Sequence, residues 1–241
     1  MVCIALSVPV GYDRRAKQII YLSMLLVLKI WEKGGPSKLE IAHDLLLDVK
    51  DAVSDLSRFV LLMDFWYPKA PLLRICDEWK ALKLICAVRS DTALYDLPPA
   101  RTGKRGRPRK RGIRLSLTDF NLKPSGLDGY LAGRRPVLTH LFGDSQVTAF
   151  VTCPTSGNGT CRLYLSTLSC HEAKQFVSEA VQFCEAEHEE FISLMFYRNR
   201  WAIEMALGRN RGNDRNCPRG TIRSARHSDP QTTFFFSMIL R

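Results

Sequence analysis

The sequence predicts an α/β fold built around a largely parallel sheet. Short apolar runs typical of buried strands alternate with segments of helical periodicity over residues 2–88. The alternation stops at 90–130, which is rich in proline, glycine and basic residues, and short strand-like runs with turn signals follow at 135–166. We therefore expect an α/β core that is interrupted by a β-rich insertion.

The core elements follow one another with short links. The first apolar run is β-branched and bounded by Pro9 and Gly11, and the first helix carries the capping-box pattern Ser37-x-x-Glu40 ahead of apolar residues at helical spacing. The expected order is a strand at Val2–Val10, an apolar stretch of undecided type within Asp13–Lys33, a helix at Ser37–Val53, a strand at Phe59–Met63, a helix at Ala70–Leu82 and a strand at Leu84–Val88.

A second capping-box pattern, Ser169-x-x-Glu172, begins a helical stretch that runs toward Leu207. The residues after it are polar and arginine-rich, without helical period, and end in FFFSMIL. Four parts are expected: a core segment at 1–89, the basic loop and β-rich insertion at 90–168, a helical core segment at 169–207, and an irregular basic tail at 208–241.

The positive charge of the chain is confined to two segments. The net charge is +11, yet residues 101–114 carry eight Arg and Lys without an acid, and residues 198–226 carry eight Arg against two acids. Concentrated positive charge indicates a polyanionic partner, either nucleic acid or an anionic membrane surface.

Membrane insertion is not expected. The apolar run Ile19–Trp31 is interrupted by Lys29 and is shorter than the roughly 20 residues that a spanning helix needs. The first residues have no basic stretch and no cleavage site of a signal peptide. We expect a cytoplasmic, nucleoid-associated protein whose eight cysteines, none in a CxxC pair, are reduced thiols.

Asp64 is a candidate metal ligand. It follows the run FVLLM directly, at the carboxyl end of an expected parallel strand, which is the edge where sites form in open α/β sheets. Its position alone fits an ordinary helix N-cap better, because a helix is expected a few residues later.

A second candidate group lies in FYRNRWAIEMALGRNR. Tyr197, Arg200, Glu204 and Arg211 fall within roughly 60° of one another on a helix that turns about 100° per residue. One helix face would then present a phenol, two guanidinium groups and a carboxylate. These groups form either an ion-pair network, or a site in which Glu204 binds metal and the cations bind phosphates.

Several motifs resemble the DDE transposases of bacterial insertion sequences. The spacing Tyr197-x2-Arg200-x3-Glu204-x6-Arg211 resembles the family's Y-x2-R-x3-E-x6-K signature, with arginine in place of the lysine. LLMDFWYPKAPLL around Asp64 is similar to the family's second-aspartate strand, and the segments 88–112 and RLYLST (162–167) are also typical of it. The similarity extends in order over roughly residues 2–207.

The resemblance implies an RNase H-like core, incomplete at its N-terminus, with an inserted β-rich segment. Asp64 and Glu204 would be catalytic and would hold Mg²⁺ (or Mn²⁺) for two-metal phosphoryl transfer, which cuts and joins DNA strands. Tyr197, Arg200 and Arg211 would contact DNA near the cut at the transposon ends. The resemblance also implies a homodimer within a transpososome.

The departures from the family imply weak or absent catalysis. The family's first catalytic Asp lies on a strand upstream of the one that VCIALSV resembles, and Asp13, in GYDRRAK, does not match that strand. The sequence after Leu207 also departs from the family pattern. We expect a transposase fragment that binds DNA nonspecifically and is inactive, or nearly so, on its own.

The basic loop supports an alternative function. Gly106-Arg107-Pro108 resembles the core of an AT-hook, which binds the minor groove, although a loop that contacts phosphates without sequence preference explains it as well. A noncatalytic DNA-binding protein would use segments 101–114 and 198–226; another RNase H-like nuclease, such as a resolvase, fits the Tyr-Arg-Glu spacing less well. The expected DNA contacts in the loop are Lys104, Arg105, Arg107, Arg109, Lys110 and Arg111.

Overall fold

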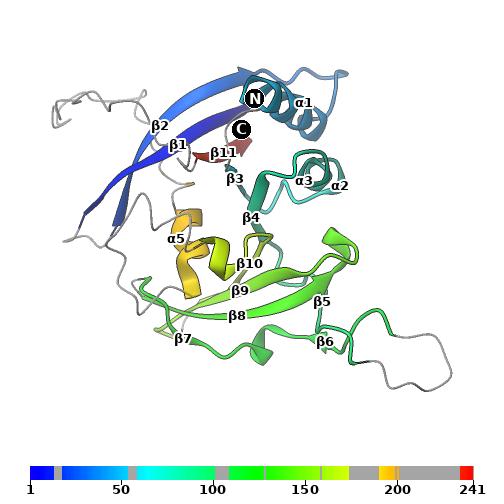
Figure 1. Ribbon diagram of the computed structural model, residues 1–241, viewed down its shortest axis with the longest axis vertical. Helices are drawn as coiled ribbons and strands as arrows, with labels where there is room; N and C mark the ends of the chain where they lie inside the picture. The colour runs from blue at the N-terminus through cyan, green and yellow to red at the C-terminus, as the bar shows by residue number, and fades with distance from the viewer. Residues whose placement is uncertain are drawn as a thin grey trace.

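The computed structural model is a mixed α/β fold dominated by one eleven-stranded sheet (Figure 1). It describes residues 1–13, 18–53, 59–100, 109–127, 129–157, 159–173, 190–198, 200 and 234–240. The strands pair in the order β2-β1-β11-β3-β4-β10-β9-β8-β5-β6, and β7 pairs with β8. The strands are β1 (Val2–Asp13), β2 (Gln18–Lys29), β3 (Phe59–Met63), β4 (Leu82–Val88), β5 (Leu94–Tyr95), β6 (Arg114–Leu115), β7 (Lys123–Pro124), β8 (Tyr130–Thr139), β9 (Val147–Pro154), β10 (Arg162–Ser166) and β11 (Phe234–Leu240).

The prediction of a largely parallel sheet is wrong. Among the described strands, only the pairs β11–β3 and β3–β4 are parallel, and every other pair is antiparallel. The reason is that hairpins rather than helical crossovers link most neighbours, as between β1 and β2 and along β8, β9 and β10.

The apolar stretch of undecided type forms β2, the partner of β1 in a long hairpin. Val2 pairs with Lys29 and Asp13 with Gln18, and the hydroxyl groups of Ser7 and Ser23 lie 2.6 Å apart across the ladder. Asp13 therefore lies at the far end of the hairpin, eleven residues or roughly 35 Å of extended strand from Val2.

Helix α1 (Lys38–Ala52) confirms the helix predicted for Ser37–Val53. The Glu40 amide donates to the Ser37 hydroxyl at 3.2 Å and the Ser37 amide donates to the Glu40 carboxylate at 2.7 Å, which completes the capping box. Leu45 and Leu46 of its apolar face are buried against the sheet.

The helix predicted for Ala70–Leu82 is wrong in its extent. Two short helices form instead, α2 (Ala70–Leu73) and α3 (Ile75–Glu78), and Leu82 already belongs to β4. Trp79 leaves helical geometry at φ −120° and packs on the Phe59 ring, with 4.9 Å between centroids. Burial of this indole against β3 outweighs the local helical pattern.

The two faces of β3 and β4 carry separate helical layers (Figure 1). Phe59, Leu61 and Met63 face α1, α2 and α3, whereas Val60 and Leu62 face α5 (Ile192–Arg198). The alternation follows from the two-residue period of a strand. All five residues of β3 are fully buried, so the strand forms a rigid base for the residue that follows it, Asp64.

The residues 208–241 were predicted to form an irregular tail, but 234–240 form strand β11 in the middle of the sheet. β11 runs antiparallel to β1, with Val2 opposite Leu240, and parallel to β3, with Phe234 opposite Phe59. The apolar run FFFSMIL pairs with β1 along residues 235–240 and with β3 along residues 234–237, so it is a strand and not an irregular tail.

The insertion predicted at 90–168 is rich in β structure, with β5 to β10 (Figure 1). A disulfide joins Cys153 at the end of β9 to Cys161 just before β10. The prediction that all cysteines are reduced is therefore wrong for this pair. The antiparallel register places the two residues side by side at the end of the ladder, which brings their sulfur atoms within bonding reach.

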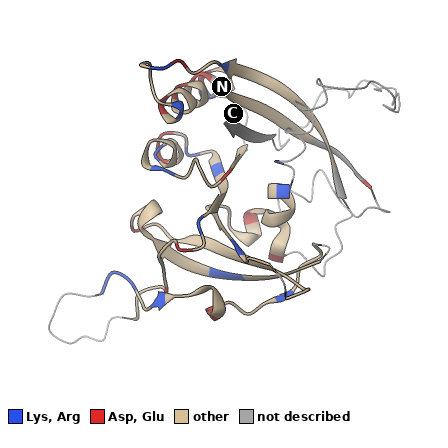
Figure 2. Ribbon diagram, turned by 180° about the vertical axis from the view of Figure 1, so that it is seen from behind, with Lys and Arg blue, Asp and Glu red and all other residues tan. Residues whose placement is uncertain are grey.

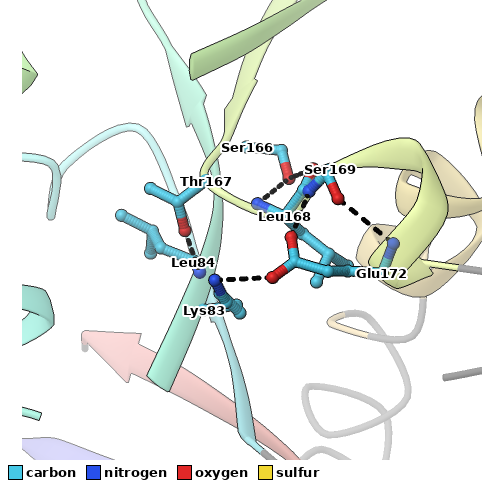
Figure 3. A network of polar contacts seen from close by, with 7 residues as sticks. All are labelled: Lys83, Leu84, Ser166, Thr167, Leu168, Ser169 and Glu172. Atoms are coloured by element: carbon cyan, nitrogen blue, oxygen red, sulfur yellow. Dashed lines mark hydrogen bonds and ion pairs between the residues drawn. The ribbon is translucent and has the colours of Figure 1, made fainter. Parts of the chain in front are cut away.

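A polar network ties β4 to the segment after β10 (Figure 3). Lys83 Nζ lies 2.8 Å from one Glu172 oxygen, while the Ser169 amide donates to the other at 2.8 Å. The Glu172 amide donates back to the Ser169 hydroxyl at 3.1 Å, which confirms the second capping box, and residues 170–173 are helical. In the described part of the chain, no helix has the length and apolar character required to cross a bilayer.

Candidate functional site

Asp64 lies where β3 ends and is held there by its own turn. The Phe65 amide donates to Asp64 Oδ1 at 2.7 Å, and the Tyr67 amide donates to the Asp64 carbonyl at 3.0 Å. The next helix, α2, has Lys69 as its N-cap residue, so the alternative that Asp64 is a helix cap is wrong. In this turn the Asp64 side chain is partly exposed, and its position is set by the end of β3 at Met63.

Two of the predicted site residues lie beside Asp64: Tyr197 in α5 and Arg200, two positions after the end of α5. Arg200 Nη1 lies 3.5 Å from Asp64 Oδ2, although the two residues are 136 positions apart in the chain. The Arg200 side chain is buried, and its guanidinium group lies 5.7 Å from the centre of the Tyr197 ring. The second expected carboxylate, Glu204, lies outside the described residues, as does Arg211.

Tyr197 of α5 packs against strand β10. Its ring contacts that of Tyr164 on β10 edge to face, at 4.9 Å between centroids, and its side chain is buried. Burial raises the pKa of Tyr197 above the usual phenol range, and the nearby Arg200 charge opposes this only in part. The phenol is therefore a neutral hydrogen-bonding group at physiological pH.

Asp64, Tyr197 and Arg200 line one cavity of about 810 Å³. Four arginines contribute to its wall: Arg89 after β4, Arg162 on β10, and Arg198 and Arg200 from the α5 segment. Asp64 is the single acidic side chain among the described residues that line it. The cavity thus combines a net positive lining with one carboxylate at its edge, which suits an anionic ligand.

Arg89 and Arg162 are site residues that the sequence reasoning missed. Each is exposed, and each reaches the cavity because the β4–β10 ladder sets Leu163 opposite Val88. The segment RLYLST pointed to the strand but not to the role of its first residue, and a pairing register between distant strands leaves no local signal.

The basic loop lies away from this cavity in the part that the structure describes. Arg109 is exposed, Lys110 Nζ lies 3.0 Å from Asp144 Oδ2, and the Arg111 guanidinium lies 5.2 Å from the centre of the Tyr95 ring. Blue marks the described basic residues of this loop, which lies beside β6 and apart from α5 (Figure 2). None of these three residues lines the cavity. The expected contacts Lys104, Arg105 and Arg107 fall outside the described residues.

The described residues do not by themselves form a metal centre. No group of three or more His, Cys, Asp or Glu side chains with ligating geometry occurs among them. One carboxylate with an arginine beside it falls short of the several oxygen ligands that Mg²⁺ prefers, so these described residues would need further ligands to hold the ion.

Comparison of the chain with protein-family models gives no match, and comparison with curated proteins gives none either.

Proposed function

We propose that the chain is a DNA-binding protein of the DDE transposase type, which binds DNA at the cavity beside Asp64 and cuts it weakly or not at all on its own. Its core would be RNase H-like, and its ligands would be transposon ends. Within this proposal Arg89, Arg162, Arg198 and Arg200 contact phosphates, while Tyr197 shapes the wall.

The contact between Arg200 and Asp64 is the observation that carries this proposal. The resemblance requires the Tyr-x2-Arg segment and the second-aspartate strand to meet in one site, across 136 residues and the whole insertion. A DNA-binding protein that relies on positive charge alone does not require this contact, because arginines that bind phosphates need no partner carboxylate at the end of a buried strand.

A divalent ion would require Glu204 as well as Asp64. Bound there, Mg²⁺ or Mn²⁺ would stabilise charge on the transferring phosphoryl group. Asp64 is held ready by the Phe65 amide at 2.7 Å. A third carboxylate would have to lie beside it, and strand β11, which pairs with β3 from Phe234 to Ser237, continues with apolar residues only, Met238 to Leu240. We therefore expect weak metal binding and little cleavage.

The test separates binding from cleavage. Purified full chain would be titrated with a blunt DNA duplex across a salt series, then incubated with a supercoiled plasmid and Mg²⁺ or Mn²⁺. We expect binding whose log K falls linearly with log salt, and nicking at or below background. Absence of binding at low salt would refute the proposal.

A noncatalytic DNA-binding role is the second candidate, and the single described carboxylate of the cavity favours it. Asp64→Asn and Glu204→Gln distinguish the two candidates. Any nicking that disappears in both variants while duplex binding persists identifies a residual enzyme. Nicking by wild type and variants alike would point to a contaminating nuclease.

A further inference from the structure

Two large aromatic side chains are exposed directly after Asp64. Phe65 is 48% exposed and Trp66 is 60% exposed, and their ring centroids lie 5.2 Å apart. Exposed neighbouring aromatic rings leave a sizeable apolar surface in water, which is a feature of binding sites more than of inert surface. The two rings are not fully stacked, because the ring planes of Phe65 and Trp66 are inclined by 35°.

The position of this pair is fixed relative to the cavity. Phe65 lines the cavity, and its amide is the group that donates to Asp64 Oδ1 at 2.7 Å. The turn is closed by the bond from the Tyr67 amide to the Asp64 carbonyl, and Tyr67 is fully buried. The aromatic faces are thus anchored to the fold at the rim of an arginine-rich hollow.

Planar apolar faces beside guanidinium groups suit one class of ligand in particular. An unpaired nucleotide presents a flat base for stacking and a phosphate for arginine, whereas a paired base hides its faces within the duplex. Tyr130, 39% exposed, supplies a further ring on the same cavity wall. A second copy of the chain fits less well, because it would bring its own arginines to this positive lining.

We propose that Phe65 and Trp66 form a stacking platform for unpaired nucleotides at the end of a DNA duplex whose phosphates lie along Arg89 and Arg162. The inference rests on the proposed function and adds a substrate preference to it: duplex ends with a single-stranded extension bind more tightly than blunt ends. Stacking contributes without base-specific hydrogen bonds, so the preference is independent of sequence.

Tryptophan fluorescence of the full chain tests this directly. The chain has four tryptophans, and Trp31, 39% exposed and 5.7 Å from Lys38 Nζ, serves as the control. We expect quenching by a duplex with a short 3′ or 5′ extension, retained in Trp31→Phe and lost in Trp66→Leu. Equal quenching in Trp66→Leu would overturn the platform.

Affinity measurements complete the test. Trp66→Leu should weaken binding of the extended duplex by about tenfold and leave the blunt duplex nearly unchanged, and Phe65→Ala should weaken binding of the extended duplex more than that of the blunt one. Equal losses on both duplexes, or no loss, would overturn the inference while the proposed DNA binding stands. Wild-type protein that binds neither duplex refutes both.

Should a variant fail to fold, the wild-type ratio of extended to blunt affinity decides: a ratio near one overturns the platform. Quenching of wild type by anionic phospholipid vesicles, with none by DNA, would also overturn it in favour of a membrane surface.

Discussion

Asp64 and Arg200 attract each other over a distance that is long for a charged hydrogen bond. Their 3.5 Å separation exceeds the roughly 2.8 Å of a well-formed pair, while the Phe65 amide holds the same carboxylate at 2.7 Å. The two side chains are therefore held together by the attraction of their charges more than by a well-directed hydrogen bond. Phosphate oxygens near this point would compete with Asp64 for the guanidinium group.

Arg200→Ala should weaken binding of a duplex by about ten- to thirtyfold at low salt, because one buried cation leaves the cavity wall. The slope of log K against log salt should decrease by about one. Fluorescence anisotropy across a salt series measures both quantities. Arg74→Ala, an exposed arginine away from this cavity, is the control and should leave both unchanged. An unaltered slope for Arg200→Ala would remove this residue from the phosphate contacts.

Part of the site was predictable from residues alone. Tyr197 and Arg200 were placed on one helix face by their spacing, and Asp64 was placed at a strand end by the run FVLLM; the family resemblance linked them. Arg89 and Arg162 were not predictable, because their meeting depends on the register of β10 against β4. Side-chain positions that depend on pairing between distant strands have no local sequence signal.

At the level of elements, the segment after β10 is fixed to β4 by one carboxylate with two partners. Burial alone would raise the pKa of Glu172, but hydrogen bonds from Lys83 and Ser169 outweigh it and lower that pKa below its usual value. A carboxylate with a lowered folded-state pKa stabilises the fold above its unfolded pKa of about 4.3 and loses that contribution as the pH falls through the folded value.

Glu172→Gln should therefore lower the free energy of unfolding by about 1 kcal/mol at pH 7, a value limited by the one-third exposure of the pair. The difference from wild type should shrink as the pH falls below the unfolded pKa of about 4.3 and through the lower folded-state pKa. Urea denaturation at several pH values measures it. Glu32→Gln, at an exposed position, provides the comparison. A difference that is constant with pH would show that the ion pair does not contribute.

The elements differ in how well the sequence predicted them. Helix α1 was predicted because its capping box, Ser37 with Glu40, is local. The helix after Ala70 was overextended because the contact of Trp79 with Phe59 is a tertiary one. The stretch that forms β2 has no clear period because both of its faces carry apolar residues: Leu22 and Met24 are exposed, whereas Tyr21 and Val27 pack against the core.

In the molecule as a whole, β11 is the only described strand that pairs both with the β1–β2 hairpin and with the rest of the sheet. Phe236 pairs with Leu6 of β1 on one side and with Leu61 of β3 on the other. Proline in a central strand removes a ladder hydrogen bond and clashes with its neighbours.

Phe236→Pro should consequently lower the free energy of unfolding by about 3 kcal/mol or more. Phe236→Ile, which retains the amide and suits a strand, should cost distinctly less. Chemical denaturation, with hydrogen exchange of the β3 amides, measures both variants. Equal stability of the two variants would show that 234–240 do not pair within the sheet in solution.

The pairing of Val2 with Leu240 also bears on biosynthesis. Strand β1 can pair with β2 early, but its other edge acquires a partner only when β11, which follows it by more than 200 residues, has been translated, so the contact order of this pairing is high. Until then the nascent chain presents two open strand edges, β1 and β3, each able to pair with other polypeptides. Chaperone capacity during translation, more than the stability of the finished protein, should therefore govern how much of it accumulates in the cell.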